Sequence, residues 1–223
     1  MSDTDSFIDE VTEEVRRDRM FLMLKRYGWI GGVVVALIVG GAAYREYDQA
    51  KTTAAAEALG DAVIAALAEN ETDKRAEALA TITAETPGGD AILKMLQAGA
   101  LANSDQAEAA VTLLAEISSN GDLPVIYRHT ATFKALGLQQ DTLSVQDLRL
   151  QYDTLAQPGA PLRLLAQEQL ALIDISEGEV EAAIERLRAI IEDAEVTSDL
   201  QDRARQVIVA LGGSLDLSAT SQG

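Results

Sequence analysis

The chain has 223 residues and a formal net charge of −18, and it contains no cysteine. Apolar residues make up 48% of the sequence and aromatic residues only 4%, and the apolar share consists mostly of Ala and Leu, which favour helices. The negative charge argues against nucleic acid as a partner, because such affinity comes largely from Lys and Arg. The lack of cysteine excludes disulfides, thiolate catalysis and Cys-ligated zinc.

The first expected element is an amphipathic helix over residues 6–26, within a cytoplasmic segment at 1–26. Ser6 is expected to be its N-cap, with Asp9 three positions later, because this pair satisfies free backbone amides. One side of the helix would dock onto a membrane complex. The alternative is a solvated or surface-lying helix that only precedes the anchor. The expected docking face consists of Phe7, Val11, Val15 and Leu22.

The main signal in the sequence is an uncharged run at residues 27–44, which reads YGWIGGVVVALIVGGAAY. As a helix it would be roughly 27 Å long, close to the ~30 Å hydrocarbon core of a bilayer. Its aliphatic side chains favour insertion by about 2 to 4 kcal/mol. We interpret it as a transmembrane helix. A cleaved signal peptide and a buried core helix are the alternatives, but the preceding 26 residues, with seven acidic side chains, are long and acidic for a signal peptide.

The basic residues that flank this segment predict its orientation. Five of them lie just before it, whereas Arg45 and Lys51 are the nearby bases after it. Because positive charge stays in the cytoplasm, the N-terminus should be cytoplasmic and the region from residue 45 onward exported. In a bacterium this means an inner-membrane protein with a periplasmic domain. The residues expected at the membrane interface are Lys25, Arg26, Tyr27, Trp29 and Tyr44.

Small residues recur every four positions inside the span, which places them on one stripe of a helix. Such stripes allow two membrane helices to approach closely. We therefore interpret this stripe as a helix-packing face for another membrane protein, although Gly and Ala are also common in membrane helices generally. The stripe consists of Gly28, Gly32, Ala36 and Gly40.

Residues 45–213 should form an acidic, all-helical domain, followed by a disordered tail at 214–223. Apolar residues recur at three and four positions throughout, with no alternating strand pattern. Seven turn-like breaks divide the region into eight helices, of which the first, about 45–69, continues from the membrane helix. The breaks lie at 70–73, 87–89, 118–122, 140–142, 157–161, 178 and 196–199.

Helices joined by short turns pack antiparallel, and hairpins with a period in the thirties are typical of an α-solenoid. The clearest such unit runs from Pro161 to about Val196, and the stretch from Lys94 to Asp122 fits the same frame less well. The residue spacing in the unit from Pro161 to about Val196 matches a tetratricopeptide repeat, in which small residues let the two helices touch. The matching residues are Leu170, Ala171, Gly178, Ala183, Leu187 and Ile190, while Gln167 and Asp174 stand where the repeat usually has Trp and Tyr.

With its acidic amphipathic start, single anchor and degenerate repeats, the chain resembles the tetratricopeptide-repeat-like family of YfgM-type ancillary subunits of the bacterial Sec translocon. The resemblance covers about residues 6–213. It implies an inner-membrane protein that sits beside the translocon and engages periplasmic chaperones or emerging clients through its repeats.

The sequence contains no recognisable catalytic, metal or cofactor motif. His129 is the only histidine, so one chain cannot form a catalytic triad or a two-histidine metal site. We therefore expect a non-enzyme without cofactors. The first hypothesis is a binding module whose repeats hold periplasmic proteins or clients. The second is a structural accessory subunit of another inner-membrane assembly, such as a respiratory complex, held by its membrane helix.

Overall fold

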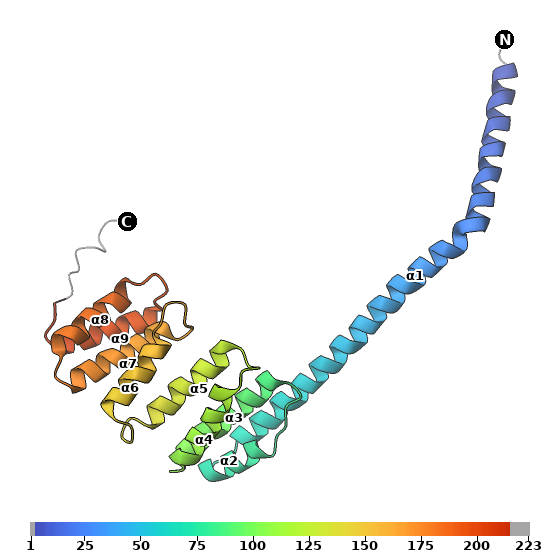
Figure 1. Cartoon of the computed structure of the whole chain (residues 1–223). Coiled ribbons are helices and arrows are strands. Elements are labelled where there is room, and N and C mark those ends of the chain that lie inside the picture. The colour runs from blue at the N-terminus through green and yellow to red at the C-terminus, as the bar shows by residue number, and fades with distance from the viewer. Residues whose placement is uncertain (1–2, 215–223) are drawn as a thin grey trace. The chain divides into compact units, whose positions relative to one another are not determined.

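A computed structural model describes the backbone of residues 3–214 and the side chains of residues 25, 26 and 29–214. Every regular element in this range is an α-helix, as the sequence predicts, and there is no strand among the described residues (Figure 1). The helices are α1 (Asp3–Leu67), α2 (Thr72–Ala80), α3 (Pro87–Ala102), α4 (Ala107–Ser119), α5 (Val125–Leu138), α6 (Val145–Leu155), α7 (Arg163–Ser176), α8 (Val180–Glu192) and α9 (Ser198–Ala210).

Helix α1 continues without a break through the expected cytoplasmic helix, the predicted span and the start of the region that is expected to be exported. The expectation that Ser6 is an N-cap is therefore wrong, because the helix already begins at Asp3. Acidic residues such as Asp3 and Asp5 favour the positive N-terminal end of a helix, which accounts for the earlier start. The chain divides into two units, residues 1–60 and residues 61–223.

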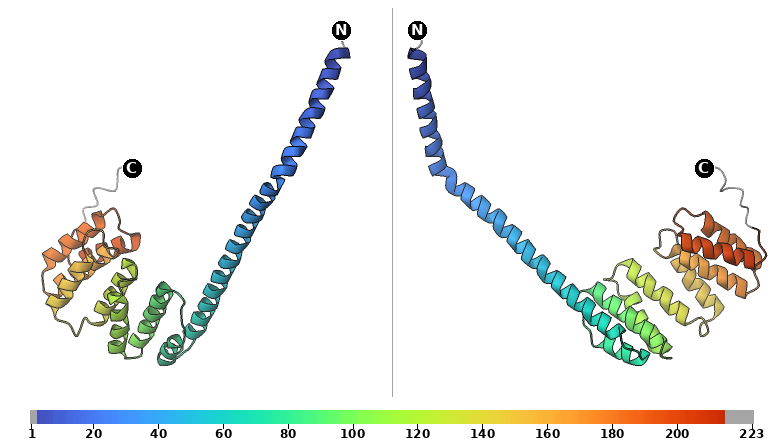
Figure 2. Two further views of the ribbon diagram at one scale, coloured as in Figure 1. Left: turned by 45° about the vertical axis from the view of Figure 1, so that its right-hand side comes forward. Right: turned by 180° about the vertical axis from the view of Figure 1, so that it is seen from behind.

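In the second unit, helices α2 to α9 each pack against the next helix in the sequence (Figure 2). Four apolar clusters fill the spaces between them. They involve in turn the end of α1 with α2 and α3, then α3 to α5, α5 to α7, and α7 to α9. Consecutive clusters therefore share a helix, so that buried apolar side chains extend along all the helices from α2 to α9, here called the helical array.

Alanines at several helix contacts are fully buried. Because a methyl group occupies little space, they let neighbouring helices approach closely, and their burial contributes through dispersion contacts with both helices. The fully buried alanines are Ala110, Ala131, Ala166, Ala171, Ala183 and Ala204. The high alanine content of the sequence thus has a packing role beyond helix propensity.

Helices α3, α7 and α9 end in the same way, with a left-handed residue after the last turn. Gly178 after α7 and Gly212 after α9 have φ angles of 82° and 79°. In both turns the next amide donates to the carbonyl five residues earlier, at 2.8 Å to Asp174 and 2.9 Å to Ile208. Glycine is favoured there because it has no Cβ to clash.

The break between α3 and α4, at residues 103–106, is not among the seven expected ones. It has the same geometry, with the Gln106 amide donating to the Leu101 carbonyl at 3.0 Å. Its left-handed residue is Asp105, with φ of 58°, instead of glycine. The turn was therefore less visible in the sequence than those at Gly178 and Gly212.

The break expected at Pro87–Gly89 lies earlier in the structure, at residues 81–86. Pro87 is the first residue of α3, a position where the missing amide hydrogen costs nothing. The hydroxyl of Thr86 accepts a hydrogen bond from the Gly89 amide at 3.1 Å and caps the helix. The proline thus starts a helix here and does not end one.

Candidate functional site

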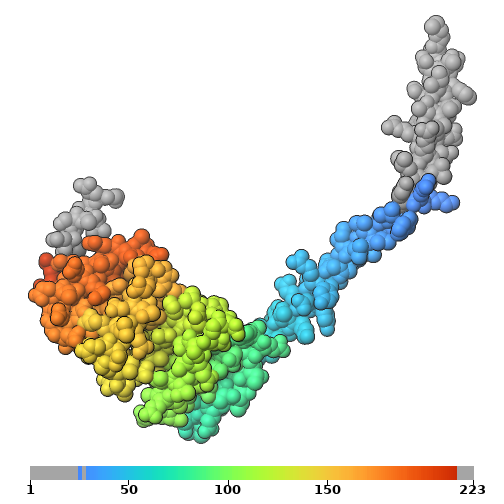
Figure 3. Space-filling model, in the orientation of Figure 1, coloured from blue at the N-terminus to red at the C-terminus, as the bar shows by residue number. Residues whose placement is uncertain are grey.

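The first candidate is the apolar part of α1. Trp29–Leu67 is long and apolar enough to cross a membrane, and none of its apolar window is buried. Leu37 is 70% exposed, and the neighbouring valines and isoleucines are also exposed. Figure 3 draws this stretch in blue to teal. The burial expected of a core helix is therefore lacking within the described part of this chain.

The small-residue stripe and the interface residues lie on this same helix. A Cβ added at Gly32 or Gly40 would meet nothing within 4 Å, and Ala36 is exposed. Trp29 and Tyr44 are also exposed, as are Lys25 and Arg26. The positions that lie outside the described side chains are Phe7, Val11, Val15, Leu22, Tyr27 and Gly28, of which only the backbone is placed, within α1.

The repeat residues lie on α7, on α8 and in the turn between them. Leu170, Ala171, Ala183, Leu187 and Ile190 are buried, and Gly178 is the left-handed residue of the turn. Ala171, Leu187 and Ile190 contribute to the apolar cluster shared with α9, whereas Leu170 belongs to the cluster shared with α5 and α6. The five buried residues hold the helices together and are not available to a ligand, whereas Gly178 is exposed.

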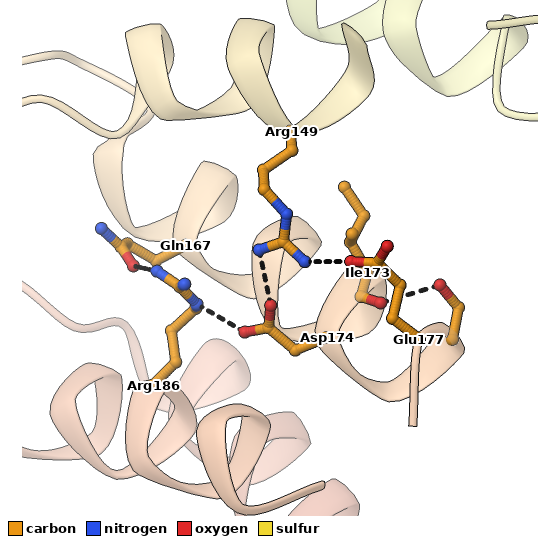
Figure 4. Close-up of polar contacts among 7 residues, drawn as sticks. Arg149, Gln167, Ile173, Asp174, Glu177 and Arg186 are labelled. Carbon is orange, nitrogen blue, oxygen red and sulfur yellow. Dashed lines mark hydrogen bonds and ion pairs between the residues drawn. The ribbon is translucent and has the colours of Figure 1, made fainter. Parts of the chain in front are cut away.

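The second candidate is a polar cluster around Asp174, which sequence reasoning did not find. Asp174 is 3% exposed, and it is the one buried charged residue in the described part of the chain. Arg149 of α6 donates to its Oδ1 at 2.6 Å, and Arg186 of α8 donates to its Oδ2 at 3.0 Å (Figure 4). One carboxylate of α7 therefore links three consecutive helices.

Two further residues complete this cluster. Arg186 also donates to Oε1 of Gln167 at 2.8 Å, and Arg149 donates to Oε2 of Glu177 at 2.5 Å. The hydrogen bonds to Asp174 and Glu177 raise the pKa of Arg149 above its ordinary value. Gln167 and Asp174, the two positions where the predicted repeat would have aromatic residues, thus serve as acceptors for arginines.

Other arginines also bind carboxylates on neighbouring segments. Arg163 at the start of α7 donates to both oxygens of Asp193, at 2.9 and 3.0 Å, and to Glu195 at 2.7 Å. Arg203 of α9 donates to both oxygens of Glu168 on α7, at 2.8 and 2.9 Å. These forked contacts fix distances between segments, because a guanidinium matches a carboxylate in one plane.

We find no arrangement suited to catalysis among the described residues. No group of three or more His, Cys, Asp or Glu side chains there could hold a metal ion. His129 is partly buried on α5, and its Nδ1 has no hydrogen-bond partner. Burial raises the pKa of Tyr152, so that this phenol is held neutral. The carboxylates in the short ion pairs are bound to arginine or lysine side chains.

Comparison with family models, with curated proteins and with solved structures gives no match for this chain. The interpretation of its function therefore depends on its own residues, above all on the exposed apolar helix and the array of packed helices.

Proposed function

We propose that this protein is a non-catalytic, membrane-anchored module for protein interaction. The observation that carries the proposal is the apolar stretch of α1, whose apolar window has no burial within the described part of the chain. Apolar side chains exposed along a whole helix have a large solvation cost in water, and a bilayer removes it. The helical unit then supplies a surface for partners.

The charge distribution supports one orientation in the membrane. The basic residues before the span hold the N-terminus in the cytoplasm, and the compact unit lies in the periplasm of a bacterium. The span itself contacts other membrane proteins. The expected interfacial side chains with described positions, Lys25, Arg26, Trp29 and Tyr44, are all exposed, as anchoring at a headgroup layer requires.

The compact unit is proposed to be a tetratricopeptide-like solenoid. Packing of each helix on its sequence neighbour supports this arrangement, as do the buried alanines between α7 and α8. Solenoids of this kind hold proteins rather than transform small molecules. The specific role proposed from the family resemblance is that of an ancillary factor of the translocon, linked to periplasmic chaperones or clients.

The topology can be tested with single cysteines, because the natural chain has none. Asp9→Cys and Ala58→Cys place one thiol on each side of the span. In intact spheroplasts a membrane-impermeant maleimide should label Ala58→Cys only, and after lysis it should label both variants. The proposal fails if the protein is soluble and shortened at its N-terminus, or if the labelling pattern is reversed.

A second experiment separates the binding module from a structural accessory subunit. The open positions Gly32 and Gly40 favour the accessory role as an alternative, because they allow close packing of a second membrane helix. Proteins cross-linked to the full chain are purified in mild detergent and identified. Removal of residues 61–223 should abolish their recovery if the array binds them. If the double variant Gly32→Leu, Gly40→Leu abolishes recovery instead, the accessory role is correct.

A further inference from the structure

A shallow hollow lined partly by acidic residues lies on the outer face of α8. Ala183, Leu187 and Ile190 are buried on the inner side of this helix. On the opposite side lies a hollow of about 720 Å³. The residues that line it are Glu181, Ile184, Glu185, Arg188, Ala189 and Glu192. The helix is labelled in Figure 1.

The three glutamates of this face form no ion pair with any described residue. Arg188, the cation among the lining residues, donates through Nη2 to the backbone carbonyl of Ser214 at 3.0 Å. Arg186, its neighbour on α8, is bound to Asp174 and Gln167 on α7. Arg186 is thus engaged on α7, whereas Arg188 keeps its charge in the hollow, because a backbone carbonyl does not neutralise a guanidinium. The three carboxylates outnumber this one cation, so the hollow is negative overall.

The positions of these carboxylates are unfavourable for the helix itself. Glu181 and Glu185 are four residues apart, so that two like charges face each other on adjacent turns. Glu192 is the last residue of α8, where the helix end is already negative and favours cations. A cationic partner would offset both the repulsion between Glu181 and Glu185 and the unfavourable position of Glu192 at the helix end. The apolar side chains of Ile184 and Ala189 would at the same time contact the aliphatic part of such a partner.

We propose that this face of α8 docks a cationic segment of a partner protein, with Lys or Arg side chains placed over Glu181, Glu185 and Glu192 and apolar side chains over Ile184 and Ala189. The inference deepens the proposed function, because it gives the array a partner of defined chemistry. A second copy of the chain would present the same negative face, and the residues that follow Ser214 include Asp216 but no cation. Neither offers the complementary charge.

The test uses the full chain in nanodiscs of zwitterionic lipid, with empty nanodiscs as the background. The probe is a labelled synthetic amphipathic helix of Lys and Leu, whose binding is followed by fluorescence anisotropy. The triple variant Glu181→Gln, Glu185→Gln, Glu192→Gln should bind it about tenfold more weakly, as three surface ion pairs are lost. The affinity for the unaltered chain should fall with added salt.

The matched control removes the same charge elsewhere. Glu77, Glu85 and Glu108 are exposed and without ion pairs among the described residues, and their change to Gln should leave the affinity unchanged within about twofold. Equal losses in both triple variants would mean diffuse attraction to the acidic chain and would overturn the proposal. Equal binding of a probe with Glu in place of Lys would do the same.

The location is tested with a small environment-sensitive label on single cysteines. Ala189→Cys in the hollow should respond to the probe, whereas Ala115→Cys on the exposed side of α4 should not. If the label at 189 is already shielded without probe, and truncation after Ser214 exposes it, the chain's own end covers the face and the proposal is wrong. The readout is binding of a defined peptide to α8, whereas the proposed topology is read by labelling on either side of the span, so that failure of one is distinguishable from failure of the other.

Discussion

Leu37 and Leu187 both lie on α-helices, in regions that the sequence marks as helical by the same residue types. In the structure Leu37 is 70% exposed, whereas Leu187 is 1% exposed. Around Leu37 the helix is apolar on all sides, and around Leu187 it is apolar on one side only. The difference teaches that an amphipathic helix is buried by its neighbours in the same chain, and that a uniformly apolar helix needs an environment that the described part of the chain does not supply.

The largest effect should come from placing charge in the apolar part of α1. The double variant Val35→Asp, Leu37→Asp costs roughly 6 kcal/mol of insertion free energy, more than the span supplies. The protein should move from the membrane pellet to the soluble fraction after carbonate extraction. Ala54→Asp, Ala58→Asp adds the same charge to an exposed part of α1 beyond the predicted span and should stay in the pellet. If the first variant also stays there, α1 is not the anchor.

The next effect concerns burial in the helical array. Leu187→Ala should lower the free energy of unfolding by about 3 kcal/mol, because it removes buried methyl groups and leaves a cavity. Leu150 of α6 is 67% exposed, so Leu150→Ala should change that free energy by less than about 0.5 kcal/mol. Chemical denaturation followed by circular dichroism measures both. Similar losses in the two variants would contradict the packing described for α8.

A somewhat smaller loss should follow from breaking the cluster at Asp174. Asp174→Asn leaves Arg149 and Arg186 without their shared charge, which should cost about 2 kcal/mol of unfolding free energy. The cost is below that of a fully buried pair, because the two arginine side chains remain 31% and 28% exposed. Asp153→Asn, on the exposed side of α6, serves as the control. An unchanged melting temperature in Asp174→Asn would mean that the cluster does not hold the helices.

The smallest effect is a pH dependence at the α8–α9 connection. The hydrogen bond from Arg163 holds the pKa of Asp193 below its ordinary value of 3.8. A carboxyl whose pKa is lowered by folding stabilises the fold above its unfolded pKa, and this contribution is lost as pH falls through the folded pKa. Arg163→Gln should therefore unfold at a lower denaturant concentration than the unaltered chain at pH 7. The difference should shrink below about pH 4, and a constant difference would exclude this coupling.

The helical class and most of the helix boundaries in the array could be predicted from sequence. Gly178 and the Pro161 region mark turns through residue types whose backbone preferences are strong. The turn at Asp105 was not expected, because aspartate adopts the left-handed conformation only in some contexts. Pro87 was assigned to a break although it begins α3. Proline is found both in the loop before a helix and at the first position of the helix, so its presence alone does not distinguish the two.

The cluster at Asp174 could not be found by spacing. Arg149 and Asp174 are 25 residues apart, and Arg186 lies 12 residues beyond Asp174. The available signal was a carboxylate between two isoleucines, Ile173 and Ile175, in the apolar second half of α7. Such a residue predicts that some partner exists, but it does not say which of the eleven Lys and Arg residues between 61 and 214 will be near.

The sequence by itself determined the helices and the apolar run of α1, because backbone propensity, turn residues and a long uncharged stretch are local properties. Only the tertiary structure decided which side of each helix is covered, which arginine reaches which carboxylate, and which face keeps an excess of carboxylates. These outcomes depend on contacts between residues far apart in the chain, and no local pattern encodes such distances.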